Sequence, residues 1–291
     1  MTLLQAIIQG IMQGLTEFLP VSSSGHLSLF QYFTGQNGEA AGFFTIILHL
    51  GTLIAVCIAF YRTIIQLIVE AFVMIGDIFR GRFHFKTDDP LRKMIFMLFI
   101  SLLPLLGFVF LSDFYKGISQ DNDIVIEGIC FLITAALLYF ADKSCRGRKH
   151  ILKMTAKDAL AIGIAQGIAP LPGVSRSGST IAVGMMCGLE RELAVEFSFI
   201  MGIPTVLAAN LLEFAQGAGQ PAAISTMAII AGVVTATVFG LLAIFMVRWL
   251  VKTDKLVYFA YYTFALGIIT VGLGIFEHLS GHVLQSFFMG V

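Results

Sequence analysis

The stretch GLTEFLPVSSSGHL, residues 14–27, interrupts an apolar segment with proline, glycine, serine and charged side chains. A second stretch, LPGVSRSGST at residues 171–180, interrupts another apolar segment in the same manner. Non-helical backbone at membrane depth is tolerated only where protein buries it or where it lines a wet cavity. We therefore predict that residues 3–34 and 158–188 each form a re-entrant helical hairpin.

The composition separates this chain from soluble proteins. Of its 291 residues, 57% are hydrophobic and 12% are charged, whereas soluble domains carry about 25% charged residues. The mean hydropathy of +0.89 points the same way. The formal net charge is zero, with 18 basic and 18 acidic residues, so the chain has no basic footprint for nucleic acid. These values exclude an ordinary soluble enzyme and predict the lipid bilayer, and no nucleic acid, as a partner.

Six further apolar stretches are long enough to cross a hydrocarbon core of about 30 Å, which takes about 20 helical residues. We predict an all-α polytopic membrane protein with about six transmembrane helices and two re-entrant hairpins, folded as one domain over residues 1–291. The predicted spans are approximately residues 42–61, 91–111, 124–141, 194–213, 224–249 and 256–276.

Basic residues set the predicted orientation, because short cytoplasmic loops carry an excess of Lys and Arg. With six spans and two hairpins that return to their own side, 16 of the 18 basic residues fall on one face. The opposite face holds Lys116, and Arg176 belongs to neither face because it lies within the second interruption. We therefore expect both termini outside. The sixteen are Arg62, Arg80, Arg82, Lys86, Arg92, Lys93, Lys143, Arg146, Arg148, Lys149, Lys153, Lys157, Arg191, Arg248, Lys252 and Lys255.

The two interruptions match each other at a constant offset of 153 residues. Three spans separate equivalent points, and an odd number of spans gives the two halves opposite topology. Inverted repeats whose broken helices meet near the midplane build the site of many transporters. We predict repeat 1 over about residues 3–141 and repeat 2 over about residues 156–276. The matched pairs are Gln13-Gly14 with Gln166-Gly167, Val21-Ser22 with Val174-Ser175, Ser24-Gly25 with Ser177-Gly178, Phe44 with Phe197 and Thr52 with Thr205.

Polar residues at the two interruptions indicate an anion site. Each interruption suits a helix end, a turn and a new helix capped by Ser or Thr, and helix N-termini favour anions. An ionisable side chain inside a membrane segment costs at least about 2.5 kcal/mol, which makes Glu17, His26 and Arg176 functional candidates. The alternative for Glu17 and Arg176 is a structural ion pair between the repeats. That pair alone would not explain the clustered hydroxyls, so we favour a phosphate site.

The residue types also indicate a reaction class. Arg with hydroxyls and backbone N–H groups can hold a phosphate and neutralise charge on its oxygens. Glu17 can accept a proton or hold a divalent cation, and a neighbouring Ser or His can act as nucleophile or proton shuttle. For His49, packing is favoured over catalysis, and Glu196 is a candidate partner of a helix N-terminus. The sequence therefore predicts phosphoryl chemistry, or phosphate binding, at the membrane.

The motifs QGLTEFLPVSSSGH (13–26) and PGVSRSGST (172–180), with EFSF (196–199) in support, resemble those of the undecaprenyl-diphosphate phosphatases, also called bacitracin-resistance proteins. The resemblance implies hydrolysis of undecaprenyl diphosphate to the monophosphate and phosphate, which recycles the lipid carrier for cell-wall synthesis and gives bacitracin resistance. It also implies a divalent cation, Mg²⁺ or Ca²⁺, and a possible homodimer. The implied location is the bacterial plasma (inner) membrane, with the site open to the periplasmic side.

The resemblance assigns roles to residues of both motifs. The family's first motif is written (E/Q)xxxE, which Gln13 and Glu17 satisfy, and Gln13 weakens the case for two carboxylates sharing a metal. The alternative to a phosphatase is a transporter or flippase for an anionic prenyl-phosphate lipid, and the nucleophile stays open between Ser23, Ser175, His26 and water. The implied catalytic residues are Glu17, Ser23, His26, Ser175 and Arg176, with Glu17 as metal ligand. The implied substrate-binding residues are Gln13, Ser22, Ser24, Gly25, Gly173, Ser177, Gly178 and Thr180.

Overall fold

The chain folds into α-helices, as predicted. In this computed structural model the described residues are 2–35, 39–84, 88–111, 117, 123–144, 147–215 and 224–289. Within these ranges the regular elements are α-helices and two short 3-10 helices, η1 (Val109–Leu111) and η2 (Ile151–Lys153), with no β-strand. The all-α fold class is therefore confirmed.

Six helices of the described chain are long and apolar enough to cross a membrane, and they coincide with the six predicted spans. Hydropathy alone locates them because few charged residues interrupt these segments. They are α3 (Glu39–Ala59), α5 (Pro90–Phe108), α7 (Val125–Ser144), α10 (Arg191–Ala215), α11 (Thr226–Lys252) and α12 (Val257–Ser280).

Each interrupted segment forms two short helices separated by a break. The first is α1 (Leu3–Phe18) followed by α2 (Ser23–Thr34), and the second is α8 (Ala156–Ile168) followed by α9 (Arg176–Met186). Their lengths of 16, 12, 13 and 11 residues fall short of the roughly 20 residues that a span requires. Helices α1 and α8 also start alike, since Thr2 and Thr155, 153 residues apart, each form a capping box.

The segment after α3 is helical, which the sequence analysis did not predict. Helix α4 (Tyr61–Phe79) carries charged side chains that reduce its hydropathy. Two of them are neutralised from α5, because Arg92 donates to Glu70 and Asp77 at 2.8 Å each. The remaining face of α4 is apolar and exposed. A short helix, α13 (Val283–Met289), follows α12 and packs near α2.

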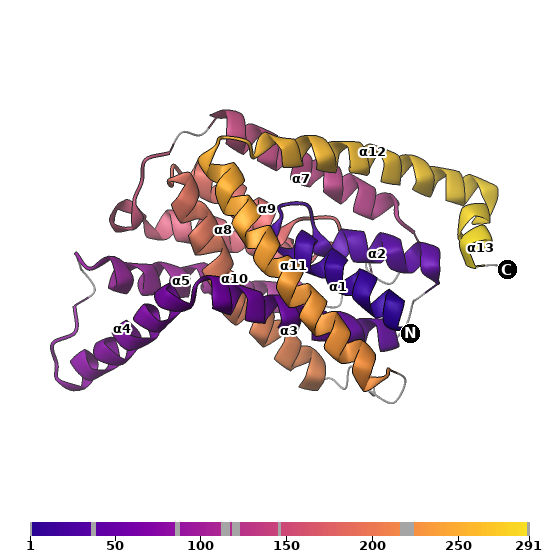
Figure 1. Cartoon of the computed structure of the whole chain (residues 1–291). Coiled ribbons are helices and arrows are strands. Elements are labelled where there is room, and N and C mark those ends of the chain that lie inside the picture. The colour runs from indigo at the N-terminus through magenta and orange to yellow at the C-terminus, as the bar shows by residue number, and fades with distance from the viewer. Residues whose placement is uncertain are drawn as a thin grey trace.

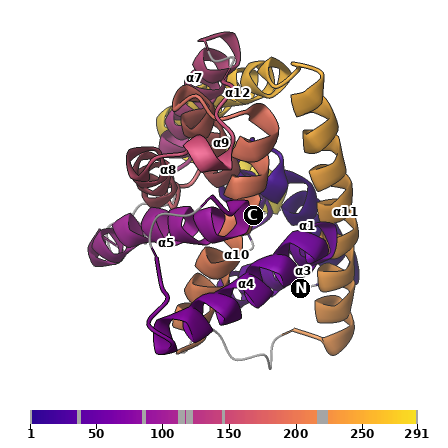
Figure 2. The ribbon, with the colours of Figure 1, turned by 90° about the vertical axis from the view of Figure 1, so that its left-hand side faces the viewer.

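The broken helices pack on spans through glycines at equivalent positions. Gly10 of α1 lies against Gly232 of α11, and Gly163 of α8 lies against Ser101 of α5. Figure 2 shows the resulting arrangement, with α1 beside α11 on one side of the molecule and α8 beside α5 on the other. Small residues allow helix backbones to approach closely inside a bilayer. The two hairpins are thus held by equivalent backbone contacts on opposite sides.

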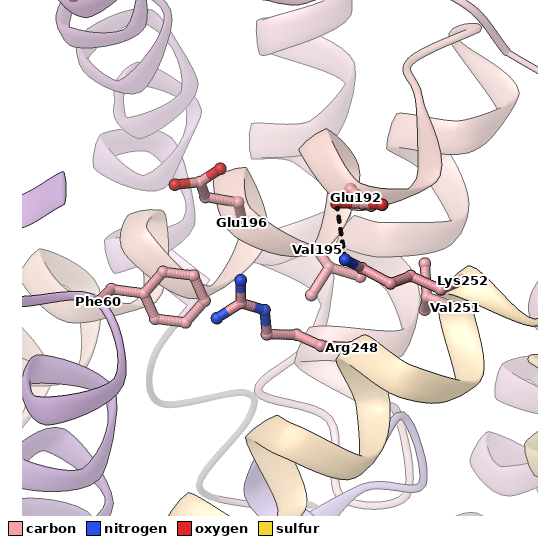
Figure 3. Close-up of a pocket in the computed structure, with 7 residues that line it drawn as sticks. All are labelled: Phe60, Glu192, Val195, Glu196, Arg248, Val251 and Lys252. Carbon is pink, nitrogen blue, oxygen red and sulfur yellow. Dashed lines mark ion pairs between the residues drawn. The ribbon is translucent and has the colours of Figure 1, made fainter. Parts of the chain in front are cut away.

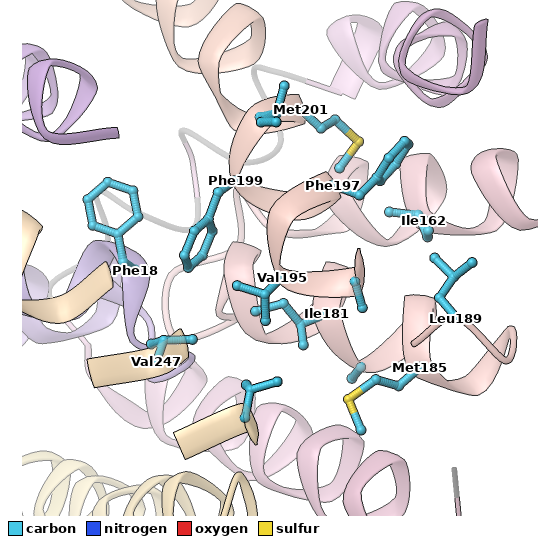
Figure 4. Packing of buried hydrophobic residues seen from close by; sticks show 14 of the residues in the cluster. Phe18, Ile162, Ile181, Met185, Leu189, Val195, Phe197, Phe199, Met201 and Val247 are labelled. Atoms are coloured by element: carbon cyan, nitrogen blue, oxygen red, sulfur yellow. The ribbon is translucent and has the colours of Figure 1, made fainter. Parts of the chain in front are cut away.

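Large apolar side chains fill the space between α8, α9 and α10. Phe197 and Met201 of α10 point toward Ile162 of α8, and Ile181 and Met185 of α9 complete the layer (Figure 4). All five are buried, with 1% or less of their surface exposed. This layer holds the start of α9, and therefore Arg176, against α10.

The two ends of the molecule differ in charge. Both termini lie toward one end, and the connections α4–α5, α7–α8 and α11–α12 lie toward the other (Figure 1). Arg80, Lys153 and Lys255 belong to those connections. Lys86, Lys116 and Arg146, used in the orientation prediction, lie outside the described residues. The described basic residues are thus concentrated at the end away from the termini.

We expect Gly163→Ala to destabilise the protein, because a Cβ there would lie 2.9 Å from the carbonyl carbon of Ser101 and overlap its oxygen. Overpacking of this kind costs about 1–3 kcal/mol. The measurement is the thermal unfolding temperature of the purified protein in detergent. Gly272→Ala on α12 is the control, since nothing lies within 4 Å of its Cβ. Equal unfolding temperatures for the two variants would contradict this packing.

Candidate active site

Both breaks start their second helix with the same serine cap. Ser22 caps α2, and its Oγ accepts the Gly25 N–H at 3.3 Å. Ser175 caps α9, and its Oγ accepts the Gly178 N–H at 3.0 Å. The predicted Ser caps are therefore present in both hairpins, and each leaves a helix N-terminus directed into the break.

The two breaks touch each other. A Cβ on Gly25 would lie 2.8 Å from Cα of Gly173, and a Cβ on Gly178 would lie 3.3 Å from Cβ of Pro20. These contacts are equivalent, because Gly25 and Gly178, like Pro20 and Gly173, are 153 residues apart. The N-termini of α2 and α9 are thus brought together, which is the arrangement that an anion site requires.

Glu17 lies where the breaks meet. Its carboxylate accepts hydrogen bonds from Gln13 Nε2 at 3.0 Å and from Ser23 Oγ at 2.7 Å, and it pairs with the guanidinium of Arg176. Only 7% of Glu17 is exposed. Four residues that the sequence singled out from both repeats therefore form one hydrogen-bonded cluster. The ion pair considered as an alternative does form, through Oε1 of Glu17. The Ser23 hydroxyl donates to the other carboxylate oxygen, Oε2.

Arg176 occupies space that a glycine provides. A Cβ on Gly202 of α10 would overlap Nη1 of Arg176. Nη1 is buried and has no hydrogen-bond partner among the described residues. Gly202 stands 153 residues after His49, so the first repeat carries a side chain where the second leaves room for Arg176. The sequence analysis did not identify Gly202, because a glycine in an apolar helix carries no local signal of this contact.

His49 belongs to the site, although the sequence favoured packing for it. Its Nδ1 donates to the carbonyl of Thr45 at 2.8 Å, and its Nε2 lies 3.8 Å from Oε2 of Glu17. The side chain is 28% exposed. His49 therefore lines the cluster from α3, beside the hydrogen bond from Ser23.

His26 follows Ser23 by one helical turn. Its Nδ1 donates to the carbonyl of Ser22 at 2.7 Å, so the neutral ring has Nε2 as acceptor. Ser22 adopts a φ of 70°, which an L-residue other than glycine rarely takes, and such conformations gather at functional sites. Nε2 lies 2.8 Å from the hydroxyl of Tyr262, a residue of α12 that the sequence analysis missed.

The remaining predicted residues support the breaks. Ser24 and Ser177 lie 3.3 Å from the capping hydroxyls of Ser22 and Ser175. Thr180 Oγ1 lies 2.6 Å from Ser198 Oγ, toward α10. Among the described contacts, Ser175, Ser177 and Thr180 have no hydrogen bond to Glu17, whereas Ser23 does.

A polar hollow lies apart from this cluster. It lies between the start of α10, the end of α11 and Phe60, with Glu196 and Arg248 on its wall (Figure 3). Glu196 accepts a hydrogen bond from Thr63 at 3.0 Å and is not part of the Glu17 cluster. The buried rings of Phe18, Phe199 and Phe60 pack edge to face, with centroid separations of 5.2 and 6.0 Å. These rings connect the residue after Glu17 to the wall of the hollow.

Oxygen donors for a cation are few. The described residues contain no group of three or more His, Cys, Asp or Glu side chains placed to hold a metal ion. The Gln13 amide faces the Glu17 carboxylate with its Nε2, and its Oε1 is buried without a hydrogen-bond partner. Mg²⁺ is commonly held by one or two carboxylates together with substrate phosphates. The donor set fits a cation shared with a phosphate ligand rather than one enclosed by protein alone.

The fold and the junction of the two broken helices define a polytopic membrane protein with a buried polar cluster at that junction. The family model described as bacitracin resistance protein BacA matches residues 6–269. The chain belongs to this bacitracin resistance protein family. It is 38% identical to an undecaprenyl-diphosphatase of Alkaliphilus metalliredigens, over 93% of this chain and 98% of the relative. It is 37% identical to one of Methanobrevibacter smithii, over 96% of this chain and 100% of the relative.

We expect Gly202→Ala to separate Arg176 from Glu17, because the added methyl group would occupy the position of Nη1. The freed guanidinium becomes accessible, so phenylglyoxal modification of Arg176 should rise severalfold when followed by mass spectrometry of its peptide. Arg92, held by two carboxylates on α4, is the internal reference. Unchanged modification of Arg176 in a folded variant would show that Gly202 does not hold it in place.

Proposed function

We propose that this protein hydrolyses undecaprenyl diphosphate to undecaprenyl phosphate and inorganic phosphate, and so confers bacitracin resistance. The observation that carries the proposal is the cluster of Ser23, Glu17 and Arg176. In this cluster the Ser23 hydroxyl and the Arg176 guanidinium both donate to the carboxylate of Glu17, which supports a nucleophile, a proton acceptor and a phosphate-binding side chain acting together. The family and its relatives, named undecaprenyl-diphosphatases, support the substrate.

The substrate diphosphate binds where the two helix N-termini meet. Backbone N–H groups at the starts of α2 and α9 and the guanidinium of Arg176 hold the phosphate oxygens. In binding, Arg176 exchanges the carboxylate of Glu17 for a phosphate. The prenyl chain remains in the bilayer, along the exposed apolar helix faces.

Ser23 is the nucleophile in the proposed reaction, because its hydroxyl already donates to Glu17 at 2.7 Å. Ser23 Oγ attacks the terminal phosphorus and its proton passes to Glu17. The anhydride P–O bond breaks and undecaprenyl phosphate leaves. Water then attacks the phosphoserine and gives a proton to His26 Nε2. The bond from phosphorus to Ser23 Oγ breaks, phosphate leaves, and Ser23 recovers its proton from Glu17. His26 Nε2 then releases its proton to solvent, which returns the site to its starting state.

A divalent cation is part of the proposal. Glu17 would hold Mg²⁺ or Ca²⁺ together with the substrate, and the unpartnered Gln13 Oε1 could join it if the amide turned its oxygen toward the carboxylate. The cation supplies charge neutralisation at the phosphate oxygens when bound. Gln13 contributes a neutral oxygen, so the protein itself provides a single carboxylate.

We also propose a location in the bacterial plasma membrane with both termini and the site on the outer side. The concentration of basic residues at the end away from the termini supports this orientation, since such residues mark the cytoplasmic side. The contacts of Phe18, Phe199 and Phe60 favour hydrolysis over transport. The three rings pack on one another between the Glu17 cluster and the hollow near Arg248, and so fill the space between the two.

Phosphate release from a prenyl diphosphate in detergent, with Mg²⁺ or Ca²⁺ present, tests the function. We expect Glu17→Gln and Arg176→Ala each to lose at least about 100-fold in kcat/KM, the usual effect of losing an acid–base group or a transition-state donor. Ser286→Ala on α13 is the control that should retain activity. Folded wild-type protein that releases no phosphate would exclude the proposal.

Trapping of a covalent intermediate tests the nucleophile. Rapid quenching in SDS at neutral pH during turnover followed by mass spectrometry should find phosphate on Ser23, and Ser23→Ala should abolish both the adduct and phosphate release. Phosphate on His26 or Ser175 would assign the nucleophile to that residue instead. Turnover with no adduct in wild type or in His26→Ala would favour direct attack by water.

Substitution of Gln13 tests the cation site. We expect Gln13→Glu to lower the Mg²⁺ concentration for half-maximal activity severalfold, because a second carboxylate replaces the neutral amide that now donates to Glu17. Gln166→Glu is the control, since Gln166 is the equivalent residue of the second repeat and donates to Thr205 at 2.7 Å. Equal Mg²⁺ dependence in wild type and Gln13→Glu would show that Gln13 does not contribute to cation binding.

A further inference from the structure

His26 is held by aromatic rings from two spans. The ring of Tyr262 on α12 stacks on it with centroids 5.8 Å apart and planes at 8°. Phe131 of α7 meets it edge to face at 5.4 Å and 82°. Neither residue belongs to the two breaks that supply the rest of the site. The imidazole is therefore oriented by α7 and α12 as well as by its own helix.

The two spans that carry these rings are fixed to each other by backbone contact. A Cβ on Gly267 of α12 would lie 3.0 Å from the carbonyl oxygen of Gly128 on α7. Gly128 is three residues before Phe131, and Gly267 is five residues after Tyr262. Close packing at this point leaves little freedom for either ring to move relative to His26.

Hydrogen bonds determine which nitrogen of His26 reacts. Nδ1 faces the Ser22 carbonyl and must carry a proton, so Nε2 of the neutral ring has a free lone pair. The Tyr262 hydroxyl, 2.8 Å away, donates to that lone pair. Its hydrogen bond stabilises the form of His26 that can take up a proton. A residue distant in sequence thus controls the tautomer and direction of a group in the site.

Tyr262 also lies where a lipid substrate arrives. Its side chain is about half exposed, and neighbouring exposed residues of α12 include Tyr258 and Phe264. Glu17, in contrast, is buried at the junction of the breaks. The Tyr262 O–H can turn away from Nε2 by rotation about its C–O bond, with no movement of the packed ring, and the phenol oxygen can then accept a hydrogen bond from a protonated Nε2.

We propose that Tyr262 is a positioning residue for His26: its ring fixes the imidazole, and its hydroxyl keeps Nε2 unprotonated for the hydrolysis of the phosphoserine. The inference rests on the proposed function for its catalytic consequence, and on geometry alone for the hydrogen bond. Water gives its proton to Nε2 while its oxygen bonds to phosphorus and Ser23 Oγ leaves. Tyr262 itself neither gains nor loses a proton.

The Tyr262→Phe variant removes the hydroxyl and keeps the ring, so it tests the contribution of the hydroxyl alone. We expect kcat to fall about tenfold, the effect of one lost hydrogen bond of roughly 1.4 kcal/mol, with KM changed less than twofold. Phosphoserine should accumulate at steady state, because its hydrolysis slows while its formation does not. Tyr262→Ala, which also removes the ring, should lose more activity. Tyr258→Phe, one helical turn earlier on α12, should behave as wild type.

A spectroscopic measurement tests the hydrogen bond without turnover. The chain has six histidines, so ¹⁵N-histidine labelling, with His26→Gln for assignment, resolves the ring nitrogens of His26. Wild type should show a protonated Nδ1 and a hydrogen-bonded acceptor at Nε2, and Tyr262→Phe should shift the Nε2 signal alone.

The outcomes separate this inference from the proposed function. Unchanged His26 signals together with an unchanged kcat in Tyr262→Phe would overturn the positioning role. If Tyr262→Phe lowered thermal stability but left kcat, KM and the His26 signals unchanged, Tyr262 would have a packing role only. That result would also overturn the positioning role. Wild type without phosphatase activity, but with the shift in Tyr262→Phe, would exclude the proposed function and retain the hydrogen bond.

Discussion

A helix broken at membrane depth leaves backbone groups that lipid cannot satisfy, and this constraint shapes the molecule. The two breaks are placed against each other, with Gly25 on Gly173 and Gly178 against Pro20. Thr134 of α7 connects the second break to a span, because its hydroxyl donates to the Gly173 carbonyl and accepts the Ser175 N–H. The spans surround this junction, and the groups left directed into it form the site.

The two repeats have matching helices and breaks but differ in the side chains that face the junction. Ser23 and Arg176 occupy equivalent positions, as do His49 and Gly202. The first repeat therefore contributes a hydroxyl and an imidazole, and the second contributes a guanidinium and the space to hold it. Two identical halves would place like charges opposite each other. The asymmetry allows the negative carboxylate of Glu17 and the positive guanidinium of Arg176 to meet.

The sequence predicts the spans, the breaks and the serine caps, because apolar length and turn residues are local signals. The offset of 153 residues also predicts that Glu17 and Ser23 lie near Arg176, because it pairs the two breaks that contain them. Helix α4 is missed because its charged residues lower its hydropathy. The sequence does not show that Arg92 of α5 neutralises Glu70 and Asp77 in the folded protein. Tyr262 is missed for another reason: 236 residues separate it from His26, and only the packing of α12 on α7 brings the two rings together.

In the proposed mechanism, the ion pair between Arg176 and Glu17 makes substrate binding an exchange of partners. A buried carboxylate is stable only while it is paired, and Arg176 satisfies Glu17 in the protein alone. When a diphosphate takes the guanidinium, Glu17 is left beside added negative charge. Either a proton or a cation must then restore the balance. In the proposed mechanism the Ser23 hydroxyl, already bonded to Glu17, gives up its proton to Glu17 as its oxygen bonds to phosphorus, and the negative charge leaves the site on the departing undecaprenyl phosphate.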